Sequence, residues 1–316
     1  MYIPAIKSAL QTARREKRLW LLAVLAAALG NLGEIEIISA SLNLTNVQGN
    51  ALFSFWQGLF ASGIFSGAGL SGIREAIGIN PLAVGLVGLI YFFVFIFGLL
   101  AIWLTVSSQS TLISALANKE QKLRSIWKHG RSKFWAVLLM NIISKGSAIL
   151  LLFGLVIAAT AGSATATLPF IFIYVILLAL VLVISFITKY ATIGIVTEDL
   201  KVKEALTKSR KIFTKNWLIT LEVAFVTLVV STVALLLWTV LSVVIALPFV
   251  ALVTSLNLSA GMSGALLITG TVITFALLII LTAAITIFYW SLWISSYQQI
   301  SSNRLTAWLH RRFGSH

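Results

Sequence analysis

The sequence predicts an all-α integral membrane protein with six transmembrane helices and three amphipathic helices on the cytosolic surface. Of its 316 residues, 59% are hydrophobic and only 10% are charged. A soluble domain cannot bury so much apolar surface, so the composition indicates a multi-pass membrane protein. The formal net charge of +14 comes from short basic stretches between long apolar runs, without a separate basic domain. The charge therefore favours anionic lipid headgroups as a partner and argues against nucleic acid.

The chain begins with a basic segment, residues 1–18, whose pattern is that of an amphipathic helix. An apolar run over 19–29 follows, an order that also describes a secretory signal peptide. Because the basic part is long and helical in pattern, we expect instead a first membrane span that continues to residue 40. Its outer half contains glycines and the carboxylates Glu34 and Glu36, so this backbone must lie against protein or water.

Residues 41–80 form the longest predicted loop. The stretch 51–65 is aromatic and uncharged, which predicts a helix that either lies along the outer interface or re-enters the membrane. Residues 67–72 fit the dinucleotide-binding pattern G-x-G-x-x-G, but that fingerprint requires a preceding strand and an acidic residue about 20 positions later. The corresponding position here falls in an apolar run, so we interpret these glycines as a turn.

Five further apolar runs predict the remaining spans. Each is long enough for a hydrocarbon core about 30 Å thick, which needs about 20 helical residues. The helix of the second span is expected to extend to residue 117. The predicted spans cover residues 81–106, 134–160, 168–187, 217–246 and 264–294.

Lysine and arginine set the orientation. All of the 23 except Arg74 and Lys145 fall at the N-terminus, in the loops around residues 120 and 205, or in the C-terminal tail. Because basic residues mark the cytosolic side, both termini are predicted to be cytosolic, with the protein in the inner (cell) membrane.

The stretch 197–217 is the clearest of the three predicted surface helices. Thr197 is predicted as its N-cap, with Glu198 and Asp199 in an acidic first turn. Trp217 opens the next apolar run, as expected where a surface helix turns into the membrane. The predicted apolar stripe of this helix consists of Ala205, Leu206, Ser209, Ile212 and Phe213.

This unit occurs twice more, each time as two apolar residues, a small residue followed by arginine, and a tryptophan ahead of a span. Three copies in one orientation favour an internal repeat whose axis lies along the membrane normal. The alternative is that any six-span protein has basic, tryptophan-flanked cytosolic loops. The repeat interpretation divides a single membrane domain, 1–316, into units of roughly 1–110, 111–192 and 193–300, with a basic tail over 301–316. The matching residues are Ala9, Leu10, Ala13, Arg14 and Trp20 in the first copy and Ile126, Trp127, Gly130, Arg131 and Trp135 in the second.

The second and third copies carry a resemblance to a known group. Residues 195–198, 204–209 and 216–217 have the sequences Ile-Val-Thr-Glu, Glu-Ala-Leu-Thr-Lys-Ser and Asn-Trp, and 130–135 is Gly-Arg-Ser-Lys-Phe-Trp. These stretches resemble uncharacterised prokaryotic six-span membrane proteins that are similar to the membrane domain of glycerophosphodiester phosphodiesterases. The resemblance implies a six-span membrane fold and brings no catalytic residues with it. None of the 316 residues looks like part of a soluble phosphodiesterase domain.

No enzymatic chemistry is predicted. His129, His310 and His316 have no metal-ligand spacing, and cysteine is absent, so neither a metal nor another cofactor is expected. The sequence also lacks a phosphate-binding loop and the nucleophile motif G-x-S-x-G.

Polar residues inside the predicted spans are the candidates for an internal site. Asn141, Ser144 and Lys145 share one helix face in the third span, and Glu222 lies near the start of the fifth. A charge inside a span usually faces the bundle or water, so Lys145 predicts either a solute or proton site or a structural ion pair. Its predicted partner is Glu222, with Glu34 as the second choice.

We therefore expect a non-enzymatic membrane organiser or partner subunit. The alternative is a transporter or channel for a small solute, built around Lys145. The expected partners are anionic lipid headgroups together with a membrane protein or a second copy of the chain. The residues predicted to contact the lipid surface are Arg14, Arg131, Lys208, Arg210, Lys211, Trp20, Trp135 and Trp217.

Overall fold

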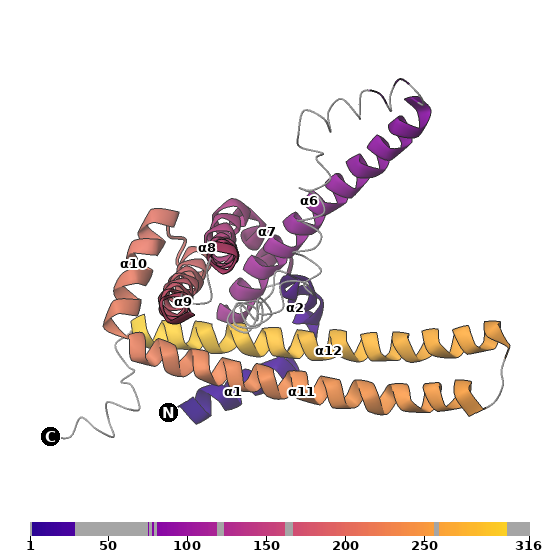
Figure 1. Cartoon of the computed structure of the whole chain (residues 1–316). Helices are drawn as coiled ribbons and strands as arrows, with labels where there is room; N and C mark the ends of the chain where they lie inside the picture. Colours follow the sequence, from indigo (N-terminus) through magenta and orange to yellow (C-terminus); the bar gives the residue numbers. More distant parts are fainter. Residues whose placement is uncertain are drawn as a thin grey trace.

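The computed structural model describes residues 2–28, 75, 78, 81–118, 123–161, 167–255 and 259–301 (Figure 1). Within these residues the regular structure is helical throughout, and no strand occurs among them. A single turn of 3-10 helix, η1 (Lys17–Leu19), joins the first two helices. The α-helices are α1 (Tyr2–Arg15), α2 (Trp20–Ala27), α6 (Pro81–Ala117), α7 (Leu123–Ser132), α8 (Phe134–Ala161), α9 (Thr167–Thr197), α10 (Val202–Lys215), α11 (Trp217–Ser255) and α12 (Ala260–Ser301).

Four of these helices are long and apolar enough to cross a membrane: α6, α9, α11 and α12. A fifth crossing results if α7 and α8, which meet at a bend of 59°, are counted as one broken span. These lengths and compositions support an all-α, multi-pass membrane protein. The outer half of the first predicted span, with Glu34 and Glu36, lies outside the described residues. So do the aromatic stretch 51–65, the glycine pattern 67–72, and the tail with His310 and His316.

Several helices are longer than the predicted spans. The extension of α6 to residue 117 is confirmed, whereas α9 continues ten residues beyond the predicted end at 187, up to Thr197. No proline or charge cluster interrupts 188–197, so the helix has no sequence signal to stop there. A helix of 31 residues, such as α9, exceeds the roughly 20 residues that a bilayer core requires, so part of it serves another purpose.

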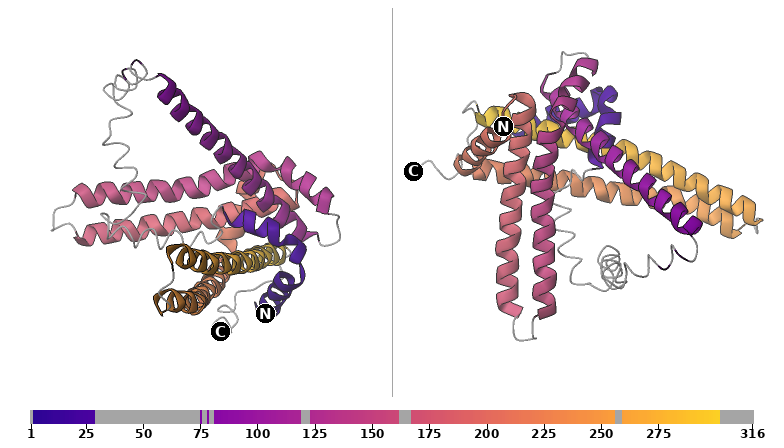
Figure 2. Two further views of the ribbon diagram at one scale, coloured as in Figure 1. Left: turned by 90° about the vertical axis from the view of Figure 1, so that its right-hand side faces the viewer. Right: turned by 90° about the horizontal axis from the view of Figure 1, so that it is seen from above.

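The long helices form three arms that diverge from a common hub (Figure 2). One arm is α6, the second is the α8–α9 hairpin, and the third is the α11–α12 hairpin. The hub consists of α1, α2, α7 and α10 together with the adjoining ends of the arms, and nearly all fully buried side chains belong to it. Away from the hub, the arms expose many large apolar side chains, as expected of helices surrounded by lipid.

The C-terminal third of α6 runs through the centre of the hub. It packs against α2, α7, α8, α9 and α12, and residues 105–116 are all buried. A side chain at Gly130 on α7 would collide with Thr111, because an added Cβ would lie 2.7 Å from the backbone nitrogen and Cα of Thr111. Glycine therefore permits the close approach of α7 to α6. The Ser110 hydroxyl reinforces this contact by donating to the Gly130 carbonyl at 2.7 Å.

The start of the third surface helix differs from the prediction. Thr197 is the last residue of α9, and α10 begins only at Val202, so the proposed Thr197 N-cap and acidic first turn are wrong. The reason is that Thr197 still belongs to α9, and the chain turns just after it at Asp199, which takes a left-handed backbone conformation with φ of 56°. In α10 the first-turn acid is Glu204, whose carboxylate accepts from the Lys201 backbone N–H at 3.4 Å.

Candidate functional site

Each of the three helices predicted to lie on the surface, α1, α7 and α10, packs on a long helix. α1 lies against α12, α7 against α6, and α10 against α9. At matching positions, the small residues Ala13, Gly130 and Ser209 are buried in these contacts. The arginine that follows each of them is exposed: Arg14, Arg131 and Arg210. At all three places, then, a buried small residue is followed by an exposed cation.

The apolar stripe of α10 faces the protein. Ala205, Ser209 and Ile212 are buried, and α9 is the main neighbour of this helix. The Phe213 ring stacks on Phe186 of α9 at 6.3 Å between centroids. Burial of this stripe therefore anchors α10 to the hub through the hydrophobic effect.

The tryptophans at the helix starts are in two different environments. Trp135 and Trp217 open α8 and α11 with 77% and 53% of their surface exposed. Such exposure suits aromatic rings at a membrane–water interface. Trp20 is half-buried instead, and its indole N–H donates to the Ala13 carbonyl at 3.1 Å, which ties α2 back to α1.

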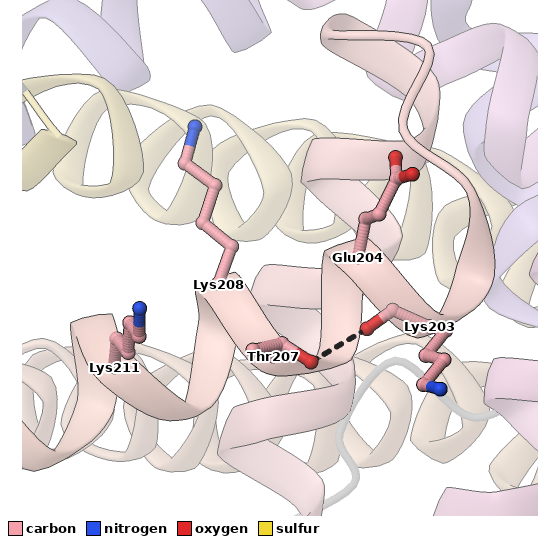
Figure 3. Close-up of a pocket in the computed structure, with 5 residues that line it drawn as sticks. All are labelled: Lys203, Glu204, Thr207, Lys208 and Lys211. Atoms are coloured by element: carbon pink, nitrogen blue, oxygen red, sulfur yellow. Dashed lines mark hydrogen bonds between the residues drawn. The ribbon is translucent and has the colours of Figure 1, made fainter.

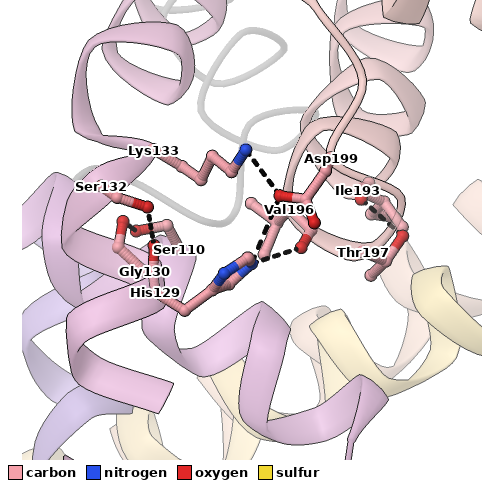
Figure 4. A network of polar contacts seen from close by, with 9 residues as sticks. All are labelled: Ser110, His129, Gly130, Ser132, Lys133, Ile193, Val196, Thr197 and Asp199. Carbon is pink, nitrogen blue, oxygen red and sulfur yellow. Dashed lines mark hydrogen bonds and ion pairs between the residues drawn. The ribbon is translucent and has the colours of Figure 1, made fainter. Parts of the chain in front are cut away.

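The segment between α9 and α10 carries two adjacent carboxylates, Glu198 and Asp199, which we call the acidic junction. Asp199 binds Lys133 with 2.6 Å between Oδ1 and Nζ, and His129 Nε2 lies 3.9 Å from the same oxygen (Figure 4). His129 Nε2 also lies 3.1 Å from the Val196 carbonyl oxygen, which only accepts, so Nε2 carries the proton. The hydrogen bond from Lys133 holds the pKa of the Asp199 carboxyl below its usual range. Asp199 thus joins the end of α9 to α7 and the start of α8.

Glu198 makes the corresponding connections on the other side. It pairs with Lys208 of α10, and the Tyr297 hydroxyl of α12 donates to its Oε1 at 3.1 Å. Lys208 Nζ also lies 5.6 Å from the centroid of the Tyr297 ring. Between them, the two neighbouring carboxylates connect α7, α9, α10 and α12.

A cluster of aromatic rings surrounds a lysine where α9, α11 and α12 meet. Lys189 Nζ lies 5.0 Å from the ring centroid of Trp293, 5.2 Å from that of Tyr289 and 5.7 Å from that of Phe186. These distances fit cation–π attraction. The neighbouring Tyr190 hydroxyl is 3.0 Å from the Thr220 hydroxyl of α11. Lys189 was not predicted as part of a site, because the expected end of the fourth span at 187 places this residue in the following loop.

The polar face predicted on the third span is partly tied to the hub. Asn141 donates through Nδ2 to Gln109 Oε1 of α6 at 2.8 Å, and Ser144 and Lys145 are half-buried. α8 packs mainly against α9 and α6, while α11, which carries Glu222, packs mainly against α12. Lys145 and Glu222 thus sit on different arms, and their pairing stays a prediction.

A run of hydroxyl groups on α6 was not anticipated as part of an internal site. Ser110 and Thr111 hydroxyls donate to backbone carbonyls, including that of Ser107 for both. The Ser107 and Ser108 hydroxyls are buried without a hydrogen-bond partner in the described part of the chain. The sequence signal was visible, since a stretch rich in serine and threonine follows directly on a fully apolar run. The fully buried hydroxyl residues of this run are Ser107, Ser108, Ser110, Thr111 and Ser114.

The outer side of α10 presents an open groove on a basic surface (Figure 3). Its lining residues are Lys203, Glu204, Thr207, Lys208 and Lys211. The amino groups of Lys203 and Lys208 point to opposite sides of the helix, and the Thr207 hydroxyl donates a hydrogen bond to the Lys203 carbonyl. The cations are therefore spread out and do not converge on one point. This arrangement suits contact with an extended negatively charged surface better than binding of a single small ligand.

Within the described ranges, no group of three or more histidine, cysteine, aspartate or glutamate residues could hold a metal ion. Compared with known protein families, curated proteins and solved structures, the chain matches none.

Proposed function

We propose that this chain is a six-span inner-membrane protein with cytosolic termini that organises its membrane surroundings without catalysing a reaction. Its hub would hold three basic surface helices at the cytosolic interface, where they bind anionic lipid headgroups and present a platform to a membrane-protein partner or a second copy. The observation that carries the proposal is the repeated arrangement of a buried small residue and an exposed arginine in α1, α7 and α10.

The order in which the short helices pack supports a threefold repeat. α7 and α10 each lie on the long helix that precedes them in the chain, and α1, which has none before it, lies on α12. In the proposed arrangement, three units, roughly 1–110, 111–192 and 193–300, would form a closed ring around an axis along the membrane normal.

The exposed cations support lipid as the first partner. Arg14, Arg131, Arg210 and Lys211 project from surface helices, and an anionic membrane attracts each such charge with about 1 kcal/mol. Trp135 and the other exposed tryptophan at the start of a long helix add interfacial anchoring.

A lipid-dependence experiment tests the proposal. Thermal stability is measured in nanodiscs of phosphatidylcholine and of phosphatidylglycerol, for the wild type and for Arg14→Gln/Arg131→Gln/Arg210→Gln. We expect phosphatidylglycerol to stabilise the wild type and the triple variant to lose most of that gain. The matched control, Arg15→Gln/Arg124→Gln/Lys215→Gln, removes equal charge from exposed positions of the same helices.

Equal losses in the two triple variants would show that only bulk charge matters, and a wild type indifferent to phosphatidylglycerol would refute lipid binding. The transporter alternative predicts a different result, namely saturable solute uptake by proteoliposomes that is lost in Lys145→Met. A partner subunit should instead co-purify with a stoichiometric membrane protein.

A further inference from the structure

One lysine belongs both to the basic surface and to the acidic junction. Lys208 lines the groove on α10, pairs with Glu198, and lies over the Tyr297 ring of α12. We infer that the ion pair between Lys208 and Glu198, which we call the latch, connects the membrane surface to the hub. The phosphate of an anionic lipid headgroup breaks this pair by competing with Glu198 for Lys208. This inference rests on the proposed function, because it requires α10 to face the headgroups.

Lys208 differs from the other groove cations in what it contacts. Lys203 and Lys211 form no ion pair with another residue in the described part of the chain. The Lys208 side chain is 37% exposed and that of Glu198 is 32% exposed, so a headgroup can reach the pair without any helix moving. A headgroup phosphate that reaches Lys208 would therefore compete with Glu198, whereas at Lys203 and Lys211 it would displace no ion pair of the described residues.

Loss of the ion pair at Lys208 should affect buried residues of the hub through Glu198. When phosphate draws Lys208 away, the side chain of Glu198 keeps, among the described residues, the hydrogen bond from Tyr297, and it faces added negative charge. Tyr297 is fully buried, its ring lies 6.1 Å from that of Tyr190, and its hydroxyl is packed 3.0 Å from where a Cβ on Gly194 would lie. Loosening Glu198 should therefore loosen the contact between the ends of α9 and α12.

A double-mutant cycle on lipid affinity tests whether Glu198 acts through Lys208. Binding of phosphatidylglycerol to the purified full chain in detergent is measured for Glu198→Gln, Lys208→Gln and the double variant. Glu198→Gln should raise the affinity about fivefold, the effect of about one unit charge near an anionic surface, and this gain should vanish in the Lys208→Gln background. The control is Glu204→Gln, which removes the same charge from the groove but contacts the Lys201 backbone, so its effect should be equal in both backgrounds.

A second measurement needs no substitution. Amide hydrogen exchange of the wild type is compared in nanodiscs of phosphatidylcholine and of an equal mixture with phosphatidylglycerol. We expect faster exchange over 198–201 and in the last two turns of α12 in the mixture, with residues 105–116 of α6 unchanged.

The outcomes separate the latch from the function on which it rests. If phosphatidylglycerol stabilises the protein but the gain from Glu198→Gln survives in the Lys208→Gln background, the latch is refuted and the proposed function stands. Unchanged exchange at the end of α12 also refutes it. If inorganic phosphate alone produces the same exchange pattern, the ligand is not a lipid and the inference is overturned.

Discussion

Asp199 allows the ion pair and the backbone of the acidic junction to be tested separately. Its side chain pairs with Lys133, and its φ of 56° is a conformation that most residues adopt only at a cost. Three replacements divide these effects. Asp199→Asn removes the charge but tolerates the left-handed conformation, Asp199→Gly accepts it without strain, and Asp199→Ala removes the charge while keeping a Cβ.

The expected magnitudes follow from the exposure of the pair. The Asp199 side chain is 64% exposed and that of Lys133 is 23% exposed, so solvent screens their attraction and Asp199→Asn should cost about 0.2–1 kcal/mol. Asp199→Ala should cost about 1–2 kcal/mol more than Asp199→Asn, because alanine has no polar side chain to support the left-handed backbone. The cost of Asp199→Gly should lie between those of Asp199→Asn and Asp199→Ala, since glycine loses more backbone entropy on folding than other residues, by about 0.5–1 kcal/mol.

Acid should remove the charge-dependent part of this difference. The pKa of the Asp199 carboxyl is lowered in the folded protein by Lys133. The ion pair therefore stabilises the fold above the unfolded pKa of about 3.9 and loses its effect as the pH falls through the folded pKa. The free-energy gap between wild type and Asp199→Asn should be full at neutral pH and shrink in acid, while the gap between Asn and Ala persists.

The assay is reversible unfolding of the purified chain in mixed micelles, followed by circular dichroism at several pH values. Lys133→Met serves as the partner variant, and it should cost no further stability in the Asp199→Asn background. If Asp199→Ala is as stable as Asp199→Asn, the left-handed conformation carries no strain. If wild type and Asp199→Asn do not differ at neutral pH, the pair contributes nothing.

Four further predictions follow from the fold. Gly130→Ala should destabilise the protein by about 1–3 kcal/mol, because the added methyl group collides with Thr111. The control Gly146→Ala, with open space around it, should stabilise α8 by up to about 1 kcal/mol. Equal thermal stabilities of the two variants would refute the close contact of α6 and α7. Changing all three of Lys208, Arg210 and Lys211 to glutamate should weaken membrane insertion or assembly. Unchanged expression and thermal stability would show that these charges are only solvated surface residues without a role in either process. A double-mutant cycle of Lys145→Met and Glu222→Gln in detergent should show coupling if they pair, because a lone buried charge costs more than none; additive effects would exclude the pair. Since the chain has no native cysteine, its topology can be mapped by introducing single cysteines and labelling them with membrane-impermeant thiol reagents. Cysteines at Ser125, Thr207 and Ser301 should label from the cytosolic side, and cysteines at Ser163 and Ser259 from outside. Labelling of Thr207→Cys from outside would contradict six spans.

Helix-forming apolar runs were predictable from sequence, because every membrane helix must satisfy its backbone internally and so carries a long apolar pattern. The stripe of α10 was predictable for the same kind of reason, since a period of 3.6 residues determines which side chains share a face. The end of α9 was not predicted, although residues 188–197 contain no signal that stops a helix, because the contacts of α9 with α6, α10 and α12 cannot be read from a local pattern.

The misplaced end of α9 explains the other misses. Once the helix was expected to stop at 187, Lys189 counted as a loop cation and Glu198 as part of a cap. Their actual partners, Trp293 and Tyr297, lie a hundred residues away in the chain, and no local pattern links them. The hydroxyl run of α6 was overlooked for a related reason, since its burial depends on helices from distant parts of the sequence that pack around α6, namely α2, α7, α8, α9 and α12.

The contact of α1 with α12 has a consequence for biogenesis. α1 is synthesised well before α12, the helix against which it packs, and its residues Ala9 and Ala13 are buried in the hub. The hub thus cannot close until α12 has been synthesised, so this long-range contact delays the assembly of the hub. A nascent or truncated product would display the uncovered face of α1 beside its basic residues, a feature by which a membrane quality-control protease could distinguish unfinished chains from finished ones.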